Sequence, residues 1–99
     1  MTYIDDVARE IERRLAPARR PKAHAQDLYR IYALLVLSRG ESVTLANVHD
    51  AWSTWMSTWD PGHRALRPFD ELSPDIQRED QPYLDAIRAA ARDRVLQRT

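Results

Sequence analysis

The chain of 99 residues contains no cysteine, which excludes disulfides, thiolate nucleophiles and zinc sites built on sulfur. Its two glycines, Gly40 and Gly62, are too few for a glycine-rich phosphate loop or for the G-x-S-x-G turn that carries a nucleophilic serine. There is no apolar N-terminal run and no apolar stretch long enough to span a bilayer, so we expect neither secretion nor a membrane-bound protein. These absences favour a cytoplasmic protein.

The chain also lacks an excess of charge of either sign. Fifteen basic residues balance fifteen acidic ones, so no global field attracts nucleic acid or an anionic membrane. A length of 99 residues suits one domain and leaves no room for a separate cofactor-binding unit. We therefore expect a single domain over residues 1–99, with no bound cofactor.

Residues 48–83 hold all three tryptophans and organise the rest of the chain. The tryptophans lie in a helix that we expect over residues 45–59. With successive residues 100° apart, as in a helix, one narrow apolar stripe forms. It consists of Val48, Trp52, Trp55, Met56 and Trp59. The opposite face carries small polar side chains, and His49 lies at the border of the stripe. We expect all three indoles to point inward and to supply much of the core.

The remaining segments predict an all-α fold of about four helices. Thr2 and Asp5 have capping-box spacing before an amphipathic stretch that reaches about residue 15. Residues 25–38 are apolar on nearly every side, which predicts an enclosed central helix. A long packed loop should separate the third helix from the fourth, with a turn at Gly62, a short helical segment at 73–78, and Asp80 as the cap of the last helix.

No set of residues predicts an active site, and we expect no catalytic residue and no enzyme activity. One alternative is a metal site with ligands drawn from His49, Asp50, Asp60 and His63. The interpretation we prefer has no metal, and His49 instead forms a hydrogen bond to the following loop near Asp70 or Glu71. The tryptophans are interpreted first as core residues. If they line a pocket, Trp52 would stack on a planar ligand, and His49, His63 or Arg67 would supply polar contacts.

A second alternative is a nucleic-acid-binding regulator of the helix-turn-helix or arginine-arm type. Its phosphate contacts would come from Arg13, Arg14, Arg19, Arg20 and Lys22. However, no lysine or arginine occurs between Glu41 and His63, where the recognition helix would lie. Nucleic acid is therefore disfavoured as a partner.

The spacing over residues 48–88 resembles the ryanodine-receptor (RyR) repeat domain. The matching residues are His49-x-x-Trp52, His63-x-x-Leu66-x-Pro68-Phe69-x-Glu71-Leu72, Gln77-x-x-Asp80 and Ala86-Ile87. RyR repeats have a longer connection where this chain has only residues 57–62, and they commonly occur in pairs. The resemblance implies an all-helical, non-enzymatic module that binds a protein partner or a small ligand.

The whole chain also resembles small actinobacterial and actinophage proteins of this size. This second resemblance implies an accessory protein that acts in the cytoplasm, or in the host cytoplasm if a phage encodes it. The sequence leaves a homodimer open.

Overall fold

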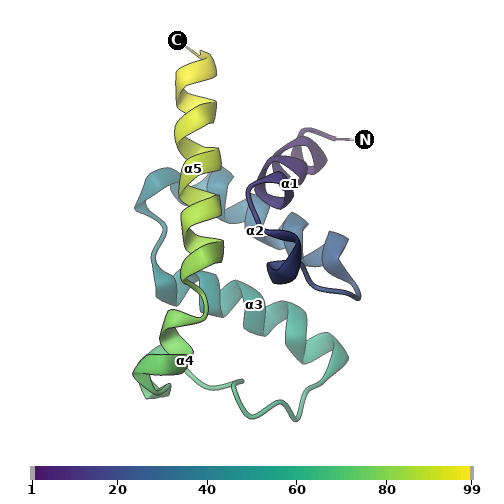
Figure 1. Ribbon diagram of the computed structural model, residues 1–99, viewed down its shortest axis with the longest axis vertical. Helices are drawn as coiled ribbons and strands as arrows, with labels where there is room; N and C mark the ends of the chain where they lie inside the picture. The colour runs from purple at the N-terminus through teal and green to yellow at the C-terminus, as the bar shows by residue number, and fades with distance from the viewer. Residues whose placement is uncertain (1, 99) are drawn as a thin grey trace.

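The computed structural model describes residues 2–98, which form helices and connecting segments with no β-strand among them (Figure 1). The elements in order are α1 (Tyr3–Arg13), η1 (Pro17–Arg19), α2 (Ala25–Arg39), η2 (Gly40–Ser42), α3 (Leu45–Trp59), η3 (Phe69–Glu71), α4 (Pro74–Arg78) and α5 (Gln81–Arg98). Here α denotes an α-helix and η a short 3₁₀ helix. The all-α prediction is confirmed: α1, α2, α3 and α5 are the long helices, and the long loop lies between α3 and α5.

Helix α1 begins where the sequence predicts. The Thr2 hydroxyl accepts a hydrogen bond from the backbone N–H of Asp5, and the Asp5 carboxylate accepts one from the backbone N–H of Thr2. This capping box satisfies amides that the first helical turn cannot pair. Val7 and Ile11 then face the core, and Leu15 stays buried after the helix has ended.

Helix α2 is central, because it packs against α1, α3 and α5. Leu28 and Tyr32 are almost completely buried in it. The expectation that every side of α2 is covered is wrong, since Leu34 remains 61% exposed. Three neighbouring helices do not cover the whole circumference of a fourth. Gly40, at φ 58°, ends the helix in the left-handed region that glycine adopts without strain.

Helix α3 starts at a second capping box, in which Thr44 and Asn47 exchange hydrogen bonds of 3.0 and 3.1 Å. Its three tryptophans have three different environments. Trp55 is buried, Trp52 is half-buried, and Trp59 is 43% exposed. The expectation that all three indoles point inward is therefore wrong for Trp59, because the last turn of α3 runs past the core.

Two contacts fix the segment before α2 to the end of α3. The indole N–H of Trp55 donates a 2.8 Å hydrogen bond to the backbone carbonyl of His24. The exposed ring of Trp59 stacks on the His24 ring, with 3.4 Å between the centroids. His24 has a left-handed backbone at φ 55°, a conformation that residues other than glycine rarely adopt. The contacts with Trp55 and Trp59 hold the turn in this conformation.

The chain between α3 and α5 folds as the packed loop that the sequence predicts. The Gln77 side chain donates hydrogen bonds to the carbonyls of Phe69, at 2.9 Å, and Leu72, at 3.2 Å. Leu72 is buried beneath them. The Ser73 hydroxyl accepts from the amide of Ile76 and caps the short helix α4. The predicted turn at Gly62 is confirmed, although Gly62 does not use the positive φ that glycine allows.

Helix α5 runs along the long axis of the molecule, and its C-terminal turns extend beyond the other helices (Figure 1). Leu84 and Ile87 are buried in its first half, whereas Val95 is 58% exposed. The spacing of Tyr83, Leu84, Ile87, Ala90, Ala91 and Val95 predicts one inner face for this helix, and that prediction is wrong at Val95. The molecule measures 42 × 26 × 24 Å. None of the helices in residues 2–98 has the length and apolar character needed to cross a membrane.

Candidate functional site

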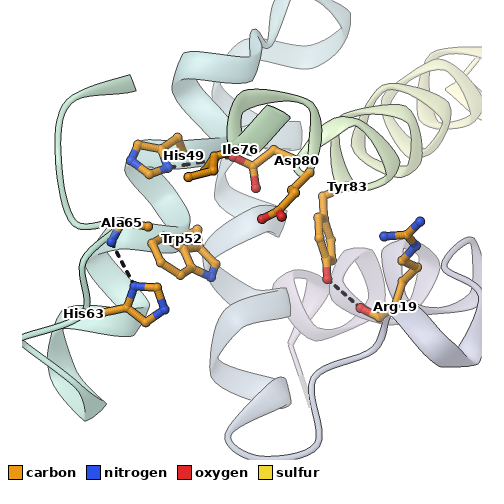
Figure 2. Close-up of a pocket in the computed structure, with 9 residues that line it drawn as sticks. Arg19, His49, Trp52, His63, Ala65, Ile76, Asp80 and Tyr83 are labelled. Carbon is orange, nitrogen blue, oxygen red and sulfur yellow. Dashed lines mark hydrogen bonds and ion pairs between the residues drawn. The ribbon is translucent and has the colours of Figure 1, made fainter. Parts of the chain in front are cut away.

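A cavity of about 320 Å³ lies where α3, the loop after it, the junction of α4 with α5, and the turn at η1 meet (Figure 2). Its lining combines aromatic rings, histidines and carboxylates. The lining residues are Arg19, His49, Trp52, His63, Ala65, Ile76, Glu79, Asp80 and Tyr83. Segments far apart in the sequence thus meet at one concave site of the size that small molecules occupy.

His49 forms the wall on the α3 side and is only 3% exposed. Its Nε2 lies 2.7 Å from the carbonyl oxygen of Arg67, which can only accept a hydrogen bond. Nε2 therefore carries a proton and donates it to the loop. The predicted bond from His49 to the loop is confirmed, and its acceptor is the backbone carbonyl of Arg67, just before Asp70 and Glu71 in the chain.

Asp80 faces His49 across the junction of α4 and α5. Its Oδ2 lies 3.8 Å from His49 Nδ1, and its side chain is 14% exposed. In the described residues 2–98, no donor forms a hydrogen bond to this carboxylate. Burial raises the pKa of Asp80 to about 6, because it outweighs the lowering by His49, and the charge of Glu79 raises the pKa further.

Asp80 was expected to cap the last helix. It does precede the first residue of α5, and its backbone carbonyl accepts the amide of Leu84. Its carboxylate, however, points into the cavity and not at the amides of α5 (Figure 2). The capping prediction is therefore wrong for the side chain, because the carboxylate lies toward His49 of α3, 3.8 Å from its Nδ1.

Trp52 and His63 form the floor of the cavity on the loop side. The two rings meet edge to face, with centroids 5.1 Å apart and planes at 81°. His63 Nδ1 accepts a 3.0 Å hydrogen bond from the backbone N–H of Ala65, which fixes the orientation of its ring (Figure 2). The ring of His49 lies 5.6 Å from the ring of Trp52. Trp52 is thus held between two histidines.

Tyr83 closes the side of the cavity opposite Trp52. Its hydroxyl donates a 2.6 Å hydrogen bond to the backbone carbonyl of Arg19, and burial raises its pKa. Behind it lies Tyr32, with its ring 5.7 Å from that of Tyr83. The Tyr32 hydroxyl is buried and has no hydrogen-bond partner within residues 2–98, and burial together with the charge of Asp80 raises its pKa well above the usual value.

Three of the four residues predicted to contact a ligand meet at the cavity: His49, Trp52 and His63. Arg67 does not line it. The Arg67 side chain is 62% exposed and pairs with Glu71 outside the cavity, and only its backbone carbonyl takes part, through His49. Sequence reasoning missed Asp80 as a cavity residue.

Tyr83 and Arg19 were also missed as cavity residues. For Asp80, the Gln77-x-x-Asp80 spacing was the available signal. Tyr83 and Arg19 left no signal, because they join the site only through tertiary packing.

The basic residues considered for nucleic-acid binding are spread around α1 and η1. Arg13 and Arg14 pair with Glu10, and Arg14 also pairs with Asp93 on α5. Arg20 donates to the carbonyl of Leu15. Several of these cations are therefore engaged within the fold. Within residues 2–98, no three histidine or carboxylate side chains gather closely enough to hold a metal ion.

Comparison with known proteins adds one finding. No curated protein and no solved structure matches the chain. A family model matches residues 2–92, which span α1, α2, α3, α4 and most of α5, so the cavity lies wholly within the matched region. The chain therefore belongs to the family DUF7701, a domain of unknown function.

Proposed function

We propose that the chain is a non-enzymatic binding module that takes a small ligand in the cavity between Trp52 and Tyr83. The observation that carries this proposal is the convergence of ring faces and one buried carboxylate, from four separate segments, on a single concave site. Ligand sites are commonly lined in this way, by apolar and aromatic surface with a few polar groups that fix orientation.

The resemblance to RyR repeats gives independent support. The residues that carry it fall into two groups in space. His49, Trp52, His63 and Asp80 line the cavity. Other motif residues hold the loop that builds one of its walls, as Gln77 does through its hydrogen bonds to Phe69 and Leu72. Residues of the motif thus line the cavity or support its wall, as expected if this chain and RyR repeats bind ligands in the same way.

The hydrogen bonds of the histidines hold the walls of the cavity in place. His49 Nε2 donates to the Arg67 carbonyl, and His63 Nδ1 accepts from the Ala65 amide, so each ring is kept in one orientation. With no cysteine in the chain, the cavity has no thiol nucleophile.

The biological setting follows from the resemblance to small actinobacterial and actinophage proteins. We infer an accessory protein that acts in the cytoplasm of such a bacterium, or of the host if a phage encodes it. A nucleic-acid-binding role has less support, because the outward face of α3 presents Asp50, Ser53, Thr54 and Ser57 and no cation.

A thermal-shift screen with amines, amino acids, nucleobases and nucleotides tests the proposal. A ligand at one hundred times its Kd stabilises the folded state by about 2.7 kcal/mol, which raises the Tm of a domain of this size by roughly 10 °C or more. Trp52→Ala should abolish the shift.

Trp59→Ala is the matched control, because Trp59 is a tryptophan of the same helix outside the cavity. It should leave the shift in place. If no compound of any class shifts the Tm, or if the shift survives Trp52→Ala, the cavity is not the binding site. A stable complex with a protein that also survives Trp52→Ala would put the function on another surface.

A further inference from the structure

The chemistry of the cavity specifies the kind of ligand, and this inference rests on the proposed binding function. Most polar groups of the lining are already used within the fold. The Tyr83 hydroxyl donates to Arg19, His49 donates to Arg67, and His63 accepts from Ala65. A ligand can therefore form hydrogen bonds only with the polar groups that have no such contact.

The principal group left over is the Asp80 carboxylate. It is only 14% exposed, it accepts no hydrogen bond from the described part of the chain, and the ring nitrogen that faces it, His49 Nδ1, is 3.8 Å away. That distance is too long for a hydrogen bond. A buried carboxylate without donors costs free energy that a ligand N–H group can recover. The site therefore favours a ligand that has a hydrogen-bond donor.

The surroundings of Asp80 favour a donor that is positively charged. Glu79, on the rim, adds a second negative charge. The cation that also lines the cavity, Arg19, lies beyond the Tyr83 ring as seen from Asp80 (Figure 2). An anionic ligand such as a phosphate would meet two carboxylates, whereas a cation would gain a charge-assisted hydrogen bond.

The aromatic rings that line the cavity together with Asp80 favour an organic cation over a metal ion. Trp52 and Tyr83 both contribute to this lining. Tryptophan and tyrosine faces attract ammonium and guanidinium groups through the ring quadrupole. Calcium and magnesium instead prefer sets of oxygen ligands, which the described lining does not assemble. A volume of about 320 Å³ suits a small molecule.

We propose that the cavity binds a small organic cation, a protonated amine or a guanidinium, with Asp80 as its counter-ion and with Trp52 and Tyr83 as the rings that flank it. The same group could be presented by a free metabolite or by an arginine or lysine side chain of a peptide. Both sources share the chemistry that Asp80 recognises.

The test compares two probes of nearly equal shape, n-butylguanidinium and n-butylurea, which differ in charge. Binding is followed by the indole N–H resonance of Trp52 in NMR titrations, which is identified by its loss in Trp52→Phe. The cation should give a saturable shift, with an affinity at least tenfold higher than that of the urea. Asp80→Asn should reduce that affinity at least tenfold, and Asp50→Asn, at an exposed aspartate of α3 outside the cavity, should not change it.

Acidification gives a second readout that a purely structural role of Asp80 would not produce. Because the pKa of Asp80 is about 6, roughly one tenth of its carboxylate remains ionised at pH 5. The groups that face it are His49 from α3, His63 from the loop, Glu79 beside it and Tyr83 from α5. Affinity for the cation should fall about tenfold between pH 7.5 and pH 5.

The source of the cation is settled by a third probe, an arginine flanked by glycines and capped at both ends. Binding tighter than that of n-butylguanidinium identifies a peptide source, and weaker binding identifies a free metabolite. Equal affinity for the urea and the guanidinium, or unchanged affinity in Asp80→Asn, would overturn the cation assignment. If a neutral or anionic compound from the thermal-shift screen binds through Trp52, the proposed function stands and only the cation assignment fails; if nothing binds, both fail.

Discussion

Replacing Asp80 with asparagine should stabilise the protein at neutral pH. The folded state keeps a proton on Asp80 up to a pKa of about 6, whereas an unfolded aspartate releases it near 3.8. Between these values the folded state binds more protons than the unfolded chain, so stability falls as the pH rises through this window and stays low above it. Asparagine has nearly the same shape and carries no charge, so it removes this loss.

The magnitude follows from the size of the pKa difference. A shift from 3.8 to about 6, at about 1.4 kcal/mol per unit, gives an upper limit near 3 kcal/mol. The carboxylate still reaches solvent through the mouth of the cavity, so we expect about 1–2 kcal/mol. For a domain of this size, that raises the Tm by roughly 4–16 °C.

Urea unfolding at pH 4, 5, 6 and 7.5 measures the effect. The difference between Asp80→Asn and the native protein should be small at pH 4 and should grow toward pH 7.5. Asp50→Asn, which makes the same chemical change at an exposed position of α3, should show no such growth. A variant that is less stable than the native protein at pH 7.5, or a difference that does not change with pH, would refute the reasoning.

Three further substitutions, two of them paired with a control substitution, test the packing and capping of the helices. Trp55→Phe removes a buried indole and its hydrogen bond to the turn before α2, and should cost about 1–3 kcal/mol in urea unfolding, whereas Trp59→Phe should cost less than about 1 kcal/mol. Tyr32→Phe removes a buried hydroxyl that has no partner in the described residues, and it should leave the free energy of unfolding unchanged or raise it. Tyr83→Phe is the control, because it breaks a hydrogen bond. A loss of stability in Tyr32→Phe as large as that in Tyr83→Phe would show that the Tyr32 hydroxyl has a partner. Thr44→Ala removes the cap of α3 and should lower the free energy of unfolding by about 1 kcal/mol, and no loss would mean that the capping box is not formed in solution.

Local signals in the sequence predicted the helices well. Thr2, Thr44 and Ser73 each begin a helix where their hydroxyl can accept an amide hydrogen bond, and all three make that bond. Such caps depend only on residues three or four positions away, which a sequence displays directly. The periodicity of the tryptophan helix was likewise sufficient to place Trp55 in the core.

The same periodicity could not give the depth of each side chain. Trp59 and Leu34 occupy apolar stripes, yet both are exposed, because burial depends on how far the neighbouring helices extend. Arg67 lies outside the cavity for a different reason. Its part in the site is played by a backbone carbonyl, which every residue has and no sequence pattern reveals.

Asp80 shows why the cavity was only partly predictable and why it matters. From its position, the residue before α5 serves as a helix cap, and asparagine would serve equally well there. The structure instead places a carboxylate in a cavity where burial opposes its charge and where no donor of the described residues forms a hydrogen bond to it. The Asp80 carboxylate lowers the stability of the fold, whereas asparagine, which has the same shape and no charge, would not. Such a loss of stability is typical of functional sites. Two measurements on Asp80→Asn therefore report on one property, which is the negative charge at this position. They are the pH dependence of unfolding and the loss of guanidinium binding.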